Sequence, residues 1–216
     1  MILKAGCDPG YAALGFNWLD EASGKTLMWK VDLRKWGGKK HSLGIADIGP
    51  CVYEFCVAHK RFFDLATEYA VERLPDKVGN KGTNLLVRDV MTAMTQTIHI
   101  LYPHIRIYYV SPVTMKSFTN TGGAKSHAES KKRTSTCSVL PPDKMQLAVE
   151  MFRGEKGKLQ VDPIDSTIAS MLLRDHKHKM ITSNYHKPGV VRKFDTVVMT
   201  SEVVYPQPNK RQRRIR

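Results

Sequence analysis

Short apolar runs separated by turn residues dominate the first part of the chain. Residues 2–7, ILKAGC, and 13–20, ALGFNWLD, flank an Asp-Pro-Gly sequence, and 25–33, KTLMWKVDL, follow the turn sequence EASGK. Apolar runs of this length bounded by Gly, Pro and Asp are typical of strands joined by tight turns. The pattern therefore predicts three consecutive strands in an antiparallel meander.

Helical and strand patterns alternate after the meander. Apolar residues spaced by three and four predict helices at about 50–66 and 84–101. Strands are predicted at 67–74, TEYAVERL, and 105–110, IRIYYV. In the first of these, period-2 alternation places Tyr69 and Val71 on one face and Ala70 and Glu72 on the other. Further helices are predicted at 111–118, 127–138 and 142–153, with a last one from about 163. This order predicts an α/β fold whose mixed sheet, an antiparallel meander followed by parallel strands, is flanked by helices.

The charge balance indicates a polyanionic partner. The chain has 216 residues and a net charge of +14, with 34 Lys and Arg against 20 Asp and Glu. Such a surface is suited to nucleic acid, although a basic helix on a membrane surface or a basic protein without this role are alternatives. We expect one domain over residues 1–186, followed by a basic, partly disordered extension over 187–216.

Cysteine usage and hydropathy argue for an intracellular protein. The four cysteines form no Cys-x-x-Cys pair, so neither a disulfide framework nor a cysteine-ligated zinc site is expected. No apolar run approaches the ~18 residues of a membrane span, so we expect no membrane. Asp8 interrupts the first apolar run, which therefore departs from a secretory signal.

Four acidic residues fall at the ends of predicted elements. Asp8 ends the first strand, Glu72 lies near the end of the fourth, and Asp162 and Asp165 begin the last helix. Carboxylates that gather repel one another unless a divalent cation neutralises them, and an oxygen-only set favours Mg²⁺ or Mn²⁺. Each residue also has a simpler explanation, since Asp-Pro-Gly forms turns, Glu72 could lie on the surface, and an Asp at a helix start can act as a cap or complement the dipole.

The ordered motifs around these acids resemble the RuvC-type Holliday junction resolvases of the ribonuclease-H-like superfamily, over residue 2 to about 175. The resemblance is greatest to the branch of poxviruses and other large DNA viruses. The motifs that carry it are AGCDPGYAALGFNWLD at 5–20, YAVERLP at 69–75, YYVSPVTMKSFTNTGGAKSHAESKKR at 108–133 and VDPIDSTIAS at 161–170.

The resemblance implies both a site and an activity. Asp8, Glu72, Asp162 and Asp165 would be the catalytic acids and would hold two Mg²⁺ ions, or Mn²⁺, per active site. The family acts as homodimers on four-way DNA junctions, making paired symmetric nicks that leave 5′-phosphates, in recombination or the processing of branched replication intermediates. It also implies an intracellular setting, with a viral replication site in the host cell as one location. Bacterial members carry an aromatic residue in the loop after the second acid, whereas residues 74–83 contain none.

Basic residues near these motifs are candidate DNA contacts. Lys116, Lys131, Lys132 and Arg133 would bring positive charge to the phosphates, and the family pattern has a functional Lys in the helix that carries the last three. Whether Lys131 or Lys132 has that role stays open, and a solvated helix face is the alternative. Lys39 and Lys40 could contact the DNA arms or lie exposed in a loop. The pair His176 and His178 is expected at the surface.

Two other functions remain open. The chain could be a related nuclease that cuts RNA–DNA hybrids or branched DNA in general, or a nonenzymatic DNA-binding protein whose acids only cap and turn the chain. The Met-containing face of the predicted helix at 84–101 could form a homodimer interface or pack entirely on its own sheet.

Overall fold

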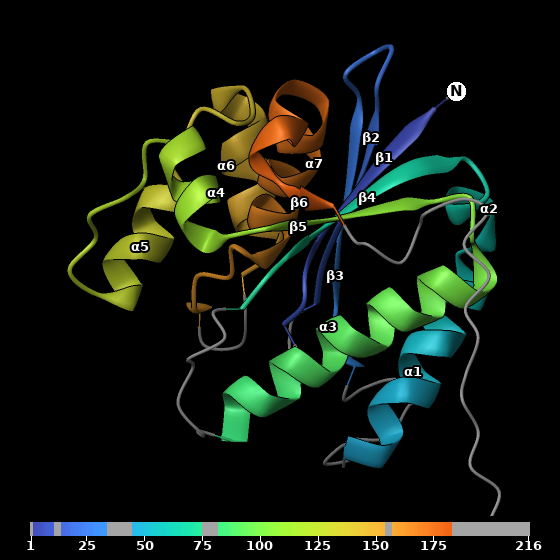
Figure 1. The fold of residues 1–216 in the computed structure, drawn as a ribbon. Coiled ribbons are helices and arrows are strands. Elements are labelled where there is room, and N and C mark those ends of the chain that lie inside the picture. Colours follow the sequence, from blue (N-terminus) through green and yellow to red (C-terminus); the bar gives the residue numbers. More distant parts are fainter. Residues whose placement is uncertain (1, 11–13, 34–44, 75–81, 154–156, 183–216) are drawn as a thin grey trace, which may run out of the picture. The chain divides into compact units, whose positions relative to one another are not determined.

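The computed structural model describes residues 2–10, 14–33, 45–74, 82–153 and 157–182, and Figure 1 shows its ribbon. The predicted extension at 187–216, the residues Lys39 and Lys40, and most of the loop at 74–83 lie outside these ranges. The predictions made for them therefore remain predictions.

A six-stranded mixed sheet in the order β3-β2-β1-β4-β5-β6 organises the described residues. Its strands are β1 (Leu3–Asp8), β2 (Leu14–Asp20), β3 (Thr26–Val31), β4 (Ala66–Glu72), β5 (Arg106–Val110) and β6 (Ile181–Thr182). The first three pair antiparallel, β4 and β5 continue the sheet in parallel from β1, and β6 returns antiparallel to β5. The predicted meander followed by parallel strands is confirmed, whereas β6 was not predicted because two residues carry no periodicity.

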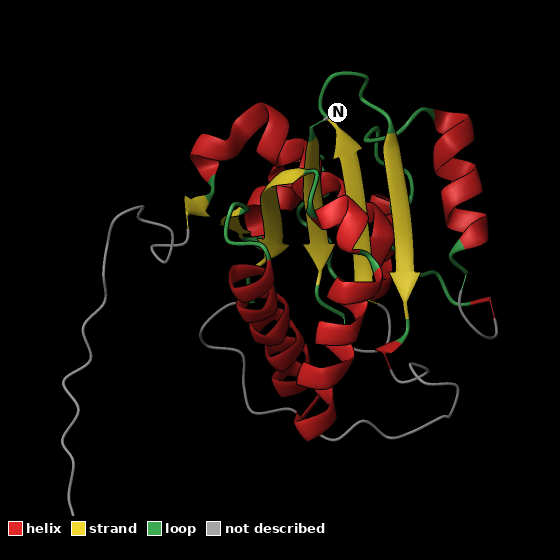
Figure 2. Cartoon of the chain, turned by 90° about the vertical axis from the view of Figure 1, so that its right-hand side faces the viewer, coloured by secondary structure: helices red, strands yellow, loops and turns green. Residues whose placement is uncertain are grey.

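Helices cover both faces of the sheet, as Figure 2 shows. They are α1 (Ile45–Ala58), α2 (Lys60–Phe63), α3 (Gly82–Leu101), α4 (Pro112–Phe118), α5 (His127–Thr134), α6 (Pro142–Met151) and α7 (Asp162–His176), followed by the short 3₁₀ helix η3 (Lys177–Lys179). Among the described helices, none has both the length and the apolar content that crossing a membrane requires.

The helix predicted at 50–66 has wrong boundaries. Helix α1 begins at Ile45 and contains Pro50, and the chain turns at His59 before the short α2. Ala66 belongs to β4. The apolar spacing continues through the turn because Phe62 and Phe63 pack on the same core as α1, so periodicity alone did not reveal the break.

Two apolar cores lie on opposite faces of the sheet. The first joins the sheet to α1 and α3 and contains Tyr69 and Val71; the second joins it to α4, α6 and α7 and contains Ala70. The predicted alternation of faces along β4 is therefore confirmed, and Glu72 points toward the α7 side with Ala70.

Helix α7 lies unusually close to β1 and β2 because two glycines face it. A Cβ atom on Gly6 would lie 2.8 Å from the backbone nitrogen of Ser170, and one on Gly15 would lie 2.8 Å from that of Pro163, so neither site has room for a side chain. The buried hydroxyl of Ser170 also donates a 2.5 Å hydrogen bond to Oδ1 of Asn17 on β2. These contacts fix the height of α7 above the sheet.

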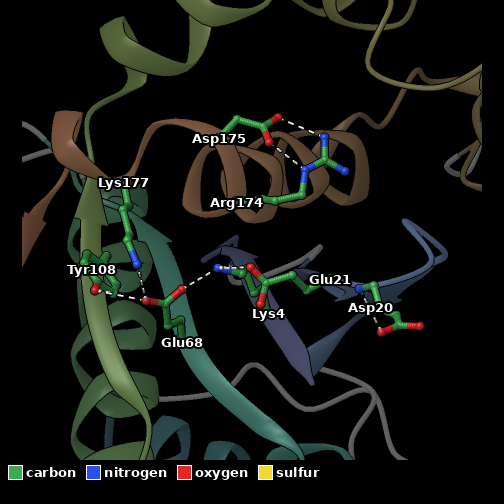
Figure 3. Close-up of polar contacts among 9 residues, drawn as sticks. Lys4, Asp20, Glu21, Glu68, Tyr108, Arg174, Asp175 and Lys177 are labelled. Atoms are coloured by element: carbon green, nitrogen blue, oxygen red, sulfur yellow. Dashed lines mark hydrogen bonds and ion pairs between the residues drawn. The ribbon is translucent and has the colours of Figure 1, made fainter. Parts of the chain in front are cut away.

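A buried ion-pair network near the starts of β1 and β4 joins the sheet to the end of α7 (Figure 3). Lys4 Nζ lies 2.7 Å from Oε2 of Glu68, and both side chains are buried between β1 and β4. Oε1 of Glu68 accepts hydrogen bonds from the hydroxyl of Tyr108 and from Lys177 of η3. Because every charge in this cluster has a partner, the desolvation cost is offset and the end of α7 is tied to the sheet.

Candidate active site

Two strand ends place the first pair of acidic residues side by side. Asp8 is the last residue of β1 and Glu72 the last residue of β4, and the preceding residues Cys7 and Val71 pair in the parallel ladder. Cys7 and Val71 belong to the core on the α1 and α3 side. Since successive side chains point to opposite faces, Asp8 and Glu72 point toward α7.

The first turn of α7 supplies the second pair. Asp162 is the first helical residue and Asp165 lies three positions later, so both are on one side of the first turn. Val161 occupies the cap position and no side chain caps this end, which contradicts the explanation of Asp162 as the helix cap. Asp165 retains its favourable place near the positive end of the helix dipole.

All four carboxyl groups line one cleft with a volume of about 420 Å³. Its walls come from the ends of β1 and β4, the start of α7, and parts of α3, α4 and α5. Residues from separate regions of the sequence, Asp8, Glu72, Asp162 and Asp165, therefore share one cleft.

Burial and mutual repulsion raise the pKa values of these carboxyl groups. Loss of water raises the pKa of Asp8 well above its usual range, the other three acids raise it further, and Lys131 opposes this effect. The pKa of Asp165 is raised well above its usual range by burial, Glu72 and Asp162. Burial raises the pKa of Glu72 to about 7, against the opposing charge of Lys116. Fully ionised, this cluster is unfavourable without added positive charge.

The structure separates the four candidate basic residues. Lys116 at the end of α4 and Lys131 on α5 line the acidic cleft, and Nζ of Lys131 lies 3.4 Å from the carbonyl oxygen of Leu159. Lys132 is exposed and does not line the cleft. Arg133 forms a 2.6 Å ion pair with Glu129 and donates a hydrogen bond to the carbonyl oxygen of Gly122.

Sequence reasoning missed four hydroxyl residues that line the same cleft, Thr119, Thr121, Ser130 and Thr134. The Oγ1 atoms of Thr119 and Thr121 lie 2.8 Å apart, within hydrogen-bond distance. Ser and Thr are common in loops and at helix ends, so their residue types gave no signal. Their proximity to the acids depends on how α4 and α5 are placed around the cleft at the start of α7.

The side chains that line the cleft are of the type that binds hard divalent cations. The cleft offers four carboxyl groups, whose oxygens Mg²⁺ and Mn²⁺ prefer, and repulsion among them would fall on cation binding. In the described residues, however, no three His, Cys, Asp or Glu side chains are arranged so that they could hold an ion as they stand. His178 is exposed, as predicted, whereas His176 is half-buried, with its ring centroid 5.5 Å from that of Phe118.

Without divalent cations, stability is expected to fall as the pH rises from about 5 to 8. The carboxyl groups of Asp8, Glu72 and Asp165 have pKa values raised above their ordinary range, so the folded protein binds more protons than the unfolded chain in this window. Their contribution to the stability of the folded protein is present at low pH. It is lost as the pH rises through the pKa that each group has in the folded protein, which is about 7 for Glu72. The melting temperature in EDTA should therefore be lower at pH 8 than at pH 5.5, and Mg²⁺ should restore it at pH 8.

The variant Glu72→Gln provides the control for this pH dependence. It removes one of the titrating groups and lowers the repulsion on its neighbours, so its melting temperature should vary less with pH. A pH profile that is identical in the variant and the wild type would contradict the prediction.

Comparisons with known proteins give matches in structure but not in sequence. No family model matches the chain, and no curated protein does either. RuvC of Thermus thermophilus, solved in complex with a Holliday junction substrate, superposes with a TM-score of 0.50 and 12% identity, over 85% of this chain and 100% of RuvC.

Two further structures have slightly lower TM-scores. A second Thermus thermophilus RuvC structure has a TM-score of 0.46 at 13% identity, over 84% of this chain and 100% of its own. The yeast mitochondrial Holliday junction resolvase has a TM-score of 0.48 at 12% identity, over 79% of this chain and 75% of its own. The first likeness, together with the order and pairing of the strands, identifies the fold: the described chain adopts the ribonuclease-H-like fold of RuvC.

Proposed function

We propose that this protein is a Mg²⁺-dependent endonuclease that resolves four-way DNA junctions by paired symmetric nicks. The observation that carries the proposal is the gathering of Asp8, Glu72, Asp162 and Asp165 in one cleft together with Lys116 and Lys131. The net charge of +14 favours a nucleic-acid substrate, and the sequence motifs and the RuvC-type fold favour a junction. Fold alone would not carry an activity, so the acidic cleft is the decisive support.

The residues have separate roles in this mechanism. The four acids would hold two divalent cations, which would supply positive charge to lower the pKa of a water molecule and to stabilise charge on the phosphate. Lys116 and Lys131 bring positive charge to the phosphate oxygens at the edge of the cleft. The water oxygen loses a proton to solvent as it forms a bond to phosphorus, the bond from phosphorus to the 3′ oxygen breaks, and that oxygen takes a proton from solvent. The products carry a 5′-phosphate and a 3′-hydroxyl.

Paired nicks require two copies of the cleft, so we propose a homodimer. Val90, Met94 and Ile98 of the predicted face of α3 pack in the core of their own sheet. The surface that this helix leaves for a dimer is a groove lined by Met91, Thr95, His99, Ile100 and others, where Ile100 is 77% exposed. The assignment to a viral branch, like the location at a viral replication site, stays a prediction from the sequence motifs.

Cleavage of labelled substrates tests the proposal. The protein should cut a four-way junction in the presence of Mg²⁺, should be inactive in EDTA, and should cut duplex, flap and RNA–DNA hybrid far less. On a supercoiled plasmid with an extruded cruciform, paired nicks should yield linear DNA rather than nicked circles. Preferential cutting of the hybrid would indicate the alternative nuclease activity. Binding without any cleavage would indicate a nonenzymatic DNA-binding protein.

A further inference from the structure

We propose that a second pocket, beside the acidic cleft, binds a phosphate of the same DNA strand next to the one that is cut. This inference rests on the proposed function. The pocket, called here the basic pocket, has a volume of about 350 Å³ and is lined by Lys116, Gly123, Ala124, Lys125, Ser126 and Ser130. Lys116 and Ser130 also line the acidic cleft, so the two cavities adjoin.

The basic pocket presents positive charge, and one of its lysines, Lys116, also acts on the carboxyl groups of Glu72 and Asp165 in the adjoining cleft. Its lining contains two lysines and no carboxylate. In the ranges that the structure describes, neither the Lys116 nor the Lys125 ammonium group has a hydrogen bond or ion pair. Glu129, which lies next to the pocket on α5, is already neutralised by its 2.6 Å ion pair with Arg133. An anion entering the pocket would therefore meet two unpaired ammonium groups.

Hydrogen bonds hold the loop that forms the basic pocket. Oε2 of Glu129 accepts a 2.8 Å hydrogen bond from the backbone nitrogen of Lys125, and Arg133 donates to the carbonyl oxygen of Gly122. Gly123 has a φ of +72°, a conformation that other residues rarely adopt. The loop between α4 and α5 is thus fixed from both sides, and the pocket exists before any ligand binds.

The chemistry of the lining selects a phosphate rather than a base. The pocket contains no aromatic side chain on which a base could stack, while lysine ammonium and serine hydroxyl groups bind phosphate oxygens. A phosphodiester chain whose scissile phosphate lies in the acidic cleft would continue past Lys116 and Ser130 into this pocket. Arg133, expected from the sequence to contact DNA, would act here through the loop as a positioning residue.

The salt dependence of DNA binding by Lys125→Ala tests the proposal. Binding of a four-way junction is measured in EDTA, so that no cleavage occurs. Loss of one phosphate contact should reduce the slope of log affinity against log salt by about 0.7–0.9. The matched control is Lys144→Ala, which removes an exposed lysine on α6 outside both cavities and should leave the slope unchanged. Circular dichroism checks that both variants are folded.

Neutral phosphate analogues locate the contact. Junctions with a single methylphosphonate beside the cleavage position should bind the wild type more weakly, and this penalty should disappear in Lys125→Ala because the contact is already lost. The proposal would be overturned if the salt slope of Lys125→Ala were unchanged. It would also be overturned if the losses of affinity caused by the methylphosphonate and by Lys125→Ala simply added. If the slope changes as expected but no DNA is ever cut, the pocket stands as a site for a DNA phosphate and the nuclease function fails.

Discussion

Replacing Asp8 by Asn is expected to lower cleavage of a four-way junction by about 10³-fold or more, because cation-assisted stabilisation of the transition state is worth several kcal/mol and each tenfold in rate is about 1.4 kcal/mol. The amide keeps the size of the side chain but cannot contribute a charged ligand. Junction binding should be retained or improved, since a negative charge beside the phosphate is removed. Single-turnover cleavage with Mg²⁺, together with binding in EDTA, measures both effects.

The fold should also tolerate this change. Asp8 is repelled by Glu72, Asp162 and Asp165, so its neutralisation should raise the melting temperature at pH 8 in EDTA. Asp143→Asn is the matched control, because Asp143 is an exposed residue of α6 outside the cleft. If Asp8→Asn cut the junction at the wild-type rate with Mg²⁺, the acidic cleft would not be the active site.

Replacing Gly15 by Ala is expected to reduce cleavage far more than it reduces the folded fraction. The added methyl group would collide with the backbone of Asp162 and Pro163, so α7 must move away from β2. Overpacking of this kind costs about 1–3 kcal/mol of stability. The larger consequence is displacement of Asp162 relative to Asp8, because misplacement of a catalytic group by about 1 Å can cost 10²-fold in rate.

Calorimetry and cleavage of the same Gly15→Ala preparation distinguish positioning from unfolding. The variant should retain a cooperative thermal transition but lose the stabilisation that Mg²⁺ confers at pH 8. Gly49→Ala is the control, since a Cβ there meets nothing within 4 Å and the residue lies in α1, where Ala is favoured over Gly. Wild-type activity in Gly15→Ala would mean that the approach of α7 to β2 does not position the site.

Period-2 patterns predicted the strands around the site and helical patterns predicted the helices, because each pattern reflects burial on one face of its element. The alternation of Tyr69, Ala70, Val71 and Glu72 was sufficient to place Glu72 on the face away from the first core, as the structure confirms. The same reasoning failed at His59, where the chain turns between two helices that share one core. When the residues on both sides of a turn stay buried in the same core, the apolar spacing continues and does not reveal the turn.

The choice between Lys131 and Lys132 illustrates what the sequence left open. Adjacent residues on a helix point about 100° apart, so only one can face a given neighbour. Both are lysines, and therefore composition cannot distinguish them. The packing of α5 against the cleft turns Lys131 toward the acids and leaves Lys132 exposed.

The sequence by itself determined the order of the first five strands and of most helices, the positive charge, and the positions of four acids at element ends, because these depend on residue type and local spacing. Only the tertiary structure decided that the acids share one cleft, that Gly15 brings α7 down onto β2, and that Lys116 and Lys125 border a second pocket. Local preferences indicate which segments form helices and which form strands. Which side chains meet depends on packing between elements that are far apart in the chain, and residue spacing does not encode this directly.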